Sequence, residues 1–316
     1  MTGKECFIRA LKHKQITGHV PHFELVFFLT MEVFGKVHPI HRNLYQWSQM
    51  SAREKLCQLS DVADCYIDIA NKYDHSAIFV QLGITDFDAI KQLLYIIRER
   101  SGDEYFLMMH GDSTCGIPNG DTMMDFSVRM YEDPESIIDK SKRNTEKCLE
   151  FASKLEGTGL LDGFGLCADY CYNTNPFFTN DLFEKLIVPS LSAVIDGYRE
   201  MDYYSIKHTD GNIMPILDQL VNCKPDALHS LDPQGGVDLA EVKRLVGDRV
   251  ALIGNVNCGL LQTGTDDEVR ADILRSLNQG MPGGGYIFST SNCIYTGLQL
   301  ERYELMHSIW REHGVY

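Results

Sequence analysis

The fold is constrained most by a regular alternation between two kinds of segment. Short apolar stretches with strand composition alternate with longer stretches of helical periodicity, each of which follows a strand. Eight segments have strand composition, namely His19–Phe28, His75–Val80, Tyr105–His110, Leu160–Leu166, Tyr203–Lys207, Ala227–His229, Val250–Gly254 and Tyr286–Ser289.

Each of these strands is followed by a segment that we expect to be helical. The helical segments are Ser51–Tyr73, Asp86–Arg100, Pro134–Leu155, Asp181–Glu200, Ile213–Asn222, Leu239–Val246, Asp266–Asn278 and Leu300–Trp310. Strands separated by helices pair in parallel, because a parallel pair needs a long crossover. Eight such units predict one α/β domain over residues 1–316, a TIM-type (β/α)8 barrel with an N-terminal helical extension. A doubly wound open sheet is the alternative, and no GxGxxG at a strand-to-helix turn supports it.

Three segments interrupt the alternation. The stretch 111–129 is the longest without periodicity, and loops of this length often act as lids over a site. The stretch 170–178 (YCYNTNPFF) is rich in aromatic residues, which either line a mouth for a flat apolar ligand or pack the loop onto the barrel. The stretch 282–285 (PGGG) precedes the last strand, so we place it at the end opposite the site and do not interpret it as a phosphate loop.

Composition excludes several classes of function. The formal net charge is −15 and no basic stripe compensates it, so we expect no nucleic-acid partner. No apolar stretch approaches the length of a membrane span, and the N-terminus has no apolar signal region. The ten cysteines form no CxxC pair and lie singly, mostly in apolar runs, as expected of reduced thiols in the cytoplasm. A homodimer is compatible with this composition.

Polar residues at the ends of two predicted strands are the best candidates for chemistry. In a barrel of this kind the strand ends share one rim, where active sites form. His208 and Asp210 follow the fifth strand two residues apart, so their side chains point to the same side. Together they form a metal site or a proton-transfer pair, unless Asp210 only caps the next helix. Cys293 lies in a polar loop after the eighth strand, and its alternative role is that of a small core residue.

Other predicted strand ends also carry polar groups. A rim with many carboxylates and imidazoles suits a divalent metal, and it lacks the glycine-rich nest and basic side chains that a phosphate needs. We expect Glu24 and Asp169 to face the mouth, as metal ligands or as partners of the ligating imidazole. The candidate substrate-binding residues at the rim are Glu24, His110, Tyr170, Asn255 and Asn292.

Six motifs resemble the uroporphyrinogen decarboxylase superfamily. They are HTDGN at 208–212, DALHSLDP at 226–233, GDRVALIGNVN at 247–257, LLQTGTDDEV at 260–269, GGYIFSTSN at 284–292 and ERYELM at 301–306. The resemblance covers nearly the whole chain and is strongest after residue 200. It implies the superfamily, not one activity.

The superfamily resembled here has two functional groups. The true decarboxylases carry an arginine-rich N-terminal segment that holds the substrate's propionates, whereas the equivalent region here, VPHFELVFFLTMEVFGK, has no arginine. The zinc-dependent methyltransferases that work with corrinoid proteins carry a His-x-Cys pair and a second, later cysteine. His208 and Cys293 match this pattern, and Asp210 departs from it because aspartate replaces the first cysteine. A carboxylate makes a harder site than a thiolate, so a thiol acceptor is less favoured.

The resemblance implies a zinc-dependent methyltransferase that moves a methyl group between a small methoxy, methylamine or thiol compound and a corrinoid protein. It implies zinc bound by His208, Asp210 and Cys293, and a corrinoid carried by a separate partner protein. His208 and Asp169 are the expected catalytic residues. Two alternatives remain: a metal-independent lyase in which Asp169 or Asp210 is the acid or base, and a noncatalytic barrel that binds a small ligand or a corrinoid partner.

Overall fold

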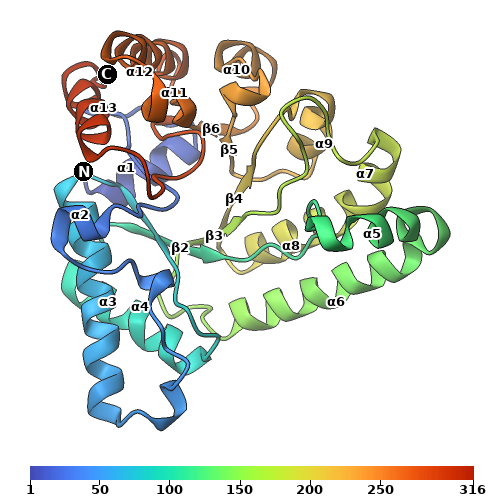
Figure 1. Ribbon diagram of the computed structural model, residues 1–316, viewed down its shortest axis with the longest axis horizontal. Coiled ribbons are helices and arrows are strands. Elements are labelled where there is room, and N and C mark those ends of the chain that lie inside the picture. Colours follow the sequence, from blue (N-terminus) through green and yellow to red (C-terminus); the bar gives the residue numbers. More distant parts are fainter.

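A curled, all-parallel sheet forms the centre of the protein, for which a computed structural model describes all 316 residues (Figure 1). Its strands lie side by side in chain order, so every connection is a crossover in the same direction along the sheet. The seven strands are β1 (Ala77–Val80), β2 (Phe106–His110), β3 (Gly163–Leu166), β4 (Tyr204–Thr209), β5 (Ala227–Ser230), β6 (Ala251–Ile253) and β7 (Tyr286–Ile287). Seven of the eight predicted strands are therefore present, and their parallel pairing is confirmed.

The predicted first strand, residues 19–28, is not a regular strand, which corrects the expectation of eight. It still lies along both edges of the sheet. Ser76 N donates to His22 O at 2.7 Å on the β1 side, and Phe23 N donates to Phe288 O at 3.1 Å on the β7 side. Pro21 has no N–H to donate, so the ladder cannot extend through it before His22. Isolated bridges at His22 and Phe27 replace the continuous strand that was expected.

Helices cover the outside of the sheet, as the alternation predicts. They are α1 (Gly3–Leu11), α2 (Thr30–Phe34), α3 (Ala52–Lys72), α4 (Phe87–Ser101), α5 (Gly120–Glu132), α6 (Pro134–Ser153), α7 (Asn180–Leu186), α8 (Val188–Glu200), α9 (Leu217–Asn222), α10 (Leu239–Val246), α11 (Cys258–Thr263), α12 (Asp266–Gly280) and α13 (Leu300–His313). The helix predicted over 181–200 is two helices, because Pro189 lies in the first turn of α8 and cannot continue α7. Short 3-10 helices occur at Pro39–His41, Trp47–Gln49, Met214–Ile216 and Pro233–Gly235.

Two apolar clusters fill the interior. The larger packs the helices onto the outer face of the sheet, and the smaller fills the space inside its curl. The predicted N-terminal extension is helix α1, whose Phe7 stacks on Phe106 at 4.7 Å between ring centroids. Phe106 begins β2, so α1 covers the N-terminal end of the strands. The loops at the opposite end are left free to build a site.

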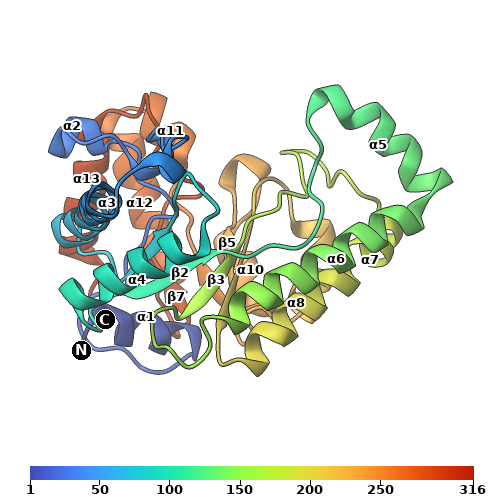
Figure 2. The same ribbon diagram turned by 90° about the horizontal axis from the view of Figure 1, so that it is seen from below.

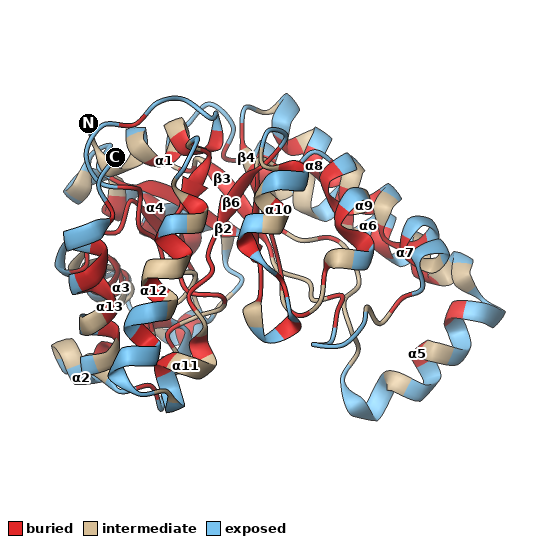
Figure 3. Ribbon diagram, turned by 90° about the horizontal axis from the view of Figure 1, so that it is seen from above, coloured by how far each residue is buried: buried red, intermediate tan, exposed pale blue.

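Helix α5 corrects the expectation that residues 111–129 are irregular. Residues 120–132 are helical, and the helix stands out from the body of the protein (Figure 2). Only Phe126 and Met130, one turn apart, are buried on it, and most of its surface is exposed (Figure 3). Phe126 packs against Phe177 and Phe178, so at least part of the aromatic stretch 170–178 packs its loop onto a helix. None of the helices has the length and apolar character that crossing a membrane requires.

Candidate metal centre

The end of β4 places two of the predicted functional side chains. His208 is buried within the strand, and Asp210 follows directly after it. Gly211 comes next with a φ of +79°, a backbone conformation that favours glycine. A Cβ at this position would lie 2.6 Å from Cys171 O, so any other residue would force the turn open. The glycine of the HTDGN motif thus allows the sharp turn that follows Asp210.

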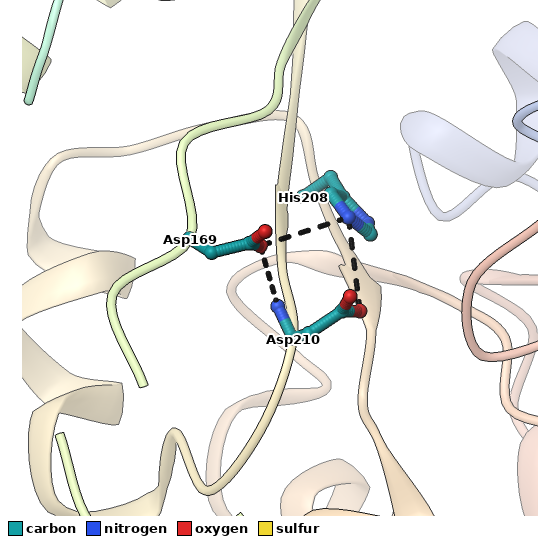
Figure 4. Close-up of side chains that lie close together, drawn as sticks. All are labelled: Asp169, His208 and Asp210. Carbon is teal, nitrogen blue, oxygen red and sulfur yellow. Dashed lines mark hydrogen bonds and ion pairs between the residues drawn. The ribbon is translucent and has the colours of Figure 1, made fainter. Parts of the chain in front are cut away.

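Asp169, His208 and Asp210 converge at the C-terminal ends of β3 and β4 (Figure 4). His208 Nε2 lies 3.8 Å from Asp169 Oδ1 and 3.7 Å from Asp210 Oδ1. One ligand atom from each residue lies within 4.8 Å of the other two. Asp210 N also donates to Asp169 Oδ1 at 3.0 Å, which ties the β3 loop to the β4 loop. This geometry brings together the two predicted catalytic residues, Asp169 and His208, and the predicted ligand Asp210.

The electrostatics of this cluster favour a bound cation. Burial raises the pKa of Asp210 to about 7, and the neighbouring Asp169 carboxylate adds to the shift. Burial lowers the pKa of His208 to about 4, so the neutral imidazole adds no positive charge beside Asp169 and Asp210. Asp210 Oδ1 is buried and has no hydrogen-bond partner. One imidazole and two carboxylates are acceptable ligands for a divalent ion, and such an ion would satisfy this oxygen. The residues present therefore fit a metal.

Residues of the loop after β7 lie beside this cluster. Asn292 donates from Nδ2 to Asp210 Oδ2 and so holds the carboxylate through the oxygen that does not face His208 Nε2. Cys293 is the next residue, and it is partly buried. Its sulfur is not one of the three grouped ligand atoms. Burial raises the pKa of the Cys293 thiol to about 12, so the sulfur is a thiol when no cation is near. Its role as a ligand stays a prediction.

Two other predicted residues are held by structural hydrogen bonds. Glu24 is buried, and its Oε2 accepts from Thr290 Oγ1 at 2.5 Å and from Thr290 N at 3.3 Å. Asn255 is also buried, and it donates to Leu231 O at 2.7 Å and accepts from Arg275 at 3.0 Å. Glu24 therefore braces the loop after β7, and Asn255 has its amide occupied within the fold.

The remaining predicted residues, Tyr170 and His110, are not grouped with the cluster. Tyr170 is fully buried, and its hydroxyl lies 2.6 Å from Thr114 Oγ1. Its ring packs under Lys207 Nζ, with 4.2 Å between the nitrogen and the ring centroid. His110 ends β2 with an exposed side chain. Binding roles for these two residues stay predictions.

Two buried residues with important contacts were given no role from the sequence, although His229 is one of the polar groups at a predicted strand end. His229 of β5 lies next to His208, with their Nδ1 atoms 2.7 Å apart. Lys207 of β4 binds Asp112 Oδ2 at 2.8 Å although both side chains are almost fully buried. The sequence does hold a signal for each. His229 falls within the DALHSLDP motif, and Lys207 is a charge at the end of an apolar strand.

Comparison with known proteins places the chain in a family. The family model described as uroporphyrinogen decarboxylase (URO-D) matches residues 117–313, more than half of the chain. The chain belongs to the uroporphyrinogen decarboxylase family. The match includes β3 to β7 and all three residues of the cluster. The resemblance found in the motifs is therefore confirmed at the level of the family.

Solved structures show the same fold at low sequence identity. A methyltransferase from Methanosarcina mazei superposes with a TM-score of 0.73 at 16% identity, over 99% of each chain. A Listeria monocytogenes protein assigned as a vitamin-B12-independent methionine synthase gives a TM-score of 0.56 at 12% identity, over 94% of this chain and 98% of that one. No curated protein sequence matches the chain. At these identities the structural likeness concerns the fold alone.

Proposed function

We propose that the protein is a zinc-dependent methyltransferase that moves a methyl group between a small compound and a corrinoid carried by a partner protein. Membership of the uroporphyrinogen decarboxylase family supports the proposal, as does the likeness to the Methanosarcina mazei methyltransferase along its full length. The small compound would be of the methoxy, methylamine or thiol type. The arginine-free segment 20–36 argues against a polycarboxylate substrate.

The observation that carries the proposal is the buried, unpartnered Oδ1 of Asp210 beside His208 Nε2. A buried carboxylate oxygen without a hydrogen-bond partner reduces stability by about 1–3 kcal/mol or more. Binding a ligand at this oxygen would remove that penalty. Asp169, His208 and Asp210 would hold the ion, with Cys293 as a fourth candidate from the neighbouring loop. If only three of these four side chains bind the ion permanently, the fourth position stays open for substrate.

Bound zinc would supply Lewis-acid chemistry, polarising a methoxy oxygen or lowering the pKa of a thiol. The protein's own residues prepare the site for this. Asn292 holds the Asp210 carboxylate in place, and the backbone amide of Asp210 holds Asp169. We also propose that residues 19–28 close the sheet into a single-domain TIM-type barrel, whose mouth faces the partner.

Metal binding and methyl transfer test the proposal together. The purified protein should contain zinc in near-stoichiometric amount by mass spectrometry, and chelator titration should give its affinity. Asp210→Ala and Cys293→Ala should each lower the zinc affinity. Each should also slow methylation of cob(I)alamin by methoxy or methylamine donors, or the demethylation of methylcob(III)alamin by a thiol acceptor. Asp267→Ala, a change at an exposed carboxylate on α12, is the matched control.

If Cys293→Ala keeps full zinc and full activity, Cys293 is not a ligand. If the wild-type protein binds no zinc, the proposal is wrong.

One observation favours a second candidate, a metal-independent acid–base reaction such as decarboxylation. A carboxyl group whose pKa is raised to about 7 suits proton transfer near neutral pH, and Asp210 is such a group. This candidate predicts a metal-free protein whose activity resists chelators and depends on Asp210. A zinc-dependent activity would exclude it.

A further inference from the structure

Two buried histidines on adjacent strands share one hydrogen bond. His208 of β4 and His229 of β5 are register partners in the sheet, and both side chains are almost fully buried. Their Nδ1 atoms lie 2.7 Å apart, and their ring centroids lie 4.9 Å apart. A hydrogen bond at this distance holds one proton between the two nitrogens. Which of the two rings carries this proton depends on the contacts that the other nitrogen of each ring makes.

The other nitrogen of His229 decides where that proton lies. His229 Nε2 lies 3.2 Å from Thr290 O, and a carbonyl oxygen only accepts hydrogen bonds. His229 Nε2 must therefore carry a proton. A neutral imidazole has only one N–H, so His229 Nδ1 offers its lone pair. The proton between the rings then belongs to His208 Nδ1.

The contacts of Ser289 and Glu24 also indicate that His208 donates and His229 accepts in the hydrogen bond between the two rings. Ser289 Oγ lies 3.4 Å from His229 Nε2 and 3.4 Å from Glu24 Oε2. The carboxylate accepts, so the serine hydroxyl donates toward Glu24 and presents its lone pairs to the His229 N–H. We expect Glu24 to act as a metal ligand or as a partner of the ligating imidazole. In the structure it is connected to His208 through Ser289 and His229.

We propose that His229 is a positioning residue that fixes His208 as the Nδ1-protonated tautomer, so that His208 Nε2 is the atom presented to Asp169 and Asp210. Asp169 Oδ1 and Asp210 Oδ1 lie 3.8 and 3.7 Å from Nε2, beyond hydrogen-bond distance, so neither carboxylate holds a proton on Nε2. A ligating imidazole is oriented in this way by the group that accepts its other N–H. The tautomer itself needs no metal, whereas its consequence for zinc rests on the proposed function.

The tautomer is tested first, on the metal-free wild-type protein. Long-range ¹H–¹⁵N correlation of ¹⁵N-histidine-labelled protein distinguishes protonated from unprotonated ring nitrogens, and substitution of His208 and His229 assigns their signals among the eleven histidines. His208 should show a protonated Nδ1, and His229 a protonated Nε2. A His208 ring protonated at Nε2 alone would overturn the proposal, whatever the protein's function.

The consequence is tested with zinc alone. His229→Leu removes the acceptor, and it should weaken zinc binding by about 10–100-fold in chelator competition. His229→Asn keeps an oxygen near the position of Nδ1, and it should restore most of the affinity. His307→Leu removes a similarly buried histidine that contacts Asp74 instead, and it should leave zinc affinity unchanged.

The two proposals fail in different ways. A wild-type protein that binds no zinc but shows the expected tautomer would refute the proposed function only. If His229→Leu folds, shown by an unchanged circular dichroism spectrum and a cooperative melt, and keeps wild-type zinc affinity, the positioning role is wrong. If His229→Leu does not fold, His229→Asn and the wild-type tautomer still decide the question.

Discussion

Lys207 and His208 are consecutive residues of β4, and each takes part in a buried charged or polar cluster of a different kind. Lys207 Nζ contacts three oxygens, Asp112 Oδ2 at 2.8 Å, Ala168 O at 2.9 Å and Leu166 O at 3.2 Å. Successive side chains of a strand point to opposite faces, so His208 lies on the other face, beside two carboxylates. In the Lys207 cluster charges and hydrogen bonds are matched. In the His208 cluster Asp210 Oδ1 is left without a partner.

The difference separates a cluster that supports the fold from one that suits the proposed metal site. The Lys207 cluster ties the loop after β2 to the loop after β3, and so it holds the backbone that carries Asp169. A buried ion pair in which every donor and acceptor is bonded makes the surrounding fold more rigid. It has no free donor or acceptor left to bind a ligand. In the His208 cluster one buried carboxylate oxygen lacks a partner, as the proposed metal site requires.

The largest expected effect is on stability, from Lys207→Met. The change leaves the Asp112 carboxylate buried without its cation, and removing one partner of such a pair costs about 3–5 kcal/mol. Urea unfolding followed by circular dichroism measures the loss. The double variant Lys207→Met/Asp112→Asn should recover part of it. A single variant as stable as the wild-type protein would show that the Lys207 cluster is not structural.

The opposite pattern is expected for Asp210→Asn. Zinc affinity should fall by more than about 100-fold, because a ligand is lost and not merely a group that orients one. The metal-free protein should keep its free energy of unfolding within about 1 kcal/mol, since a carboxylate with an unsatisfied oxygen is replaced by a neutral amide. Asp112→Asn is the matched variant, which should lose stability instead. Equal losses of stability in both variants would remove the contrast.

Lowering the pH should reduce the contribution of the Lys207 cluster to the free energy of unfolding. The Lys207 ammonium and the hydrogen bonds from Thr114 outweigh burial and lower the pKa of Asp112 to about 2. A depressed carboxyl pKa contributes stability above the ordinary pKa of about 4, and this contribution is lost as pH falls toward 2. The contribution is on the order of 2 kcal/mol. Unfolding free energies measured from pH 5 to pH 2 should therefore fall less in Asp112→Asn than in the wild-type protein. Identical slopes would contradict this.

The smallest expected effect concerns the segment that follows Asp112. The Lys207 cluster holds the start of residues 111–119, whereas α5 is held through Phe126 and Met130. Limited proteolysis should cut first at α5, and the two halves should stay associated because the sheet on both sides remains intact. Phe126→Ala should speed this cleavage several-fold. Recovery of an independently stable fragment ending near residue 150 would contradict a single domain.

The sequence by itself determined the order and type of most elements. The helix predicted over 239–246 is α10 with the same bounds, because Asp238 caps it and the apolar spacing is regular. The predicted helix over residues 51–73 becomes α3, with Ser51 as its cap. Period-two alternation also placed His208 and Asp210 on one side of a strand end. Side chains point in directions that repeat with a fixed period along a helix or a strand. The relative positions of residues close in sequence can therefore be predicted without a structure.

Only the tertiary structure decided which distant groups meet. It showed that residues 19–28 form isolated bridges on both edges of the sheet, that α5 is a helix, and that Asp169, rather than Glu24, joins Asp210 beside His208. It also buried Tyr170 beneath Lys207 and left Cys293 outside the group of three ligand atoms. The contact between His208 and His229 depends on the register of β4 against β5. Register is set by packing across the whole sheet and not by either strand alone, so no local pattern could have revealed it.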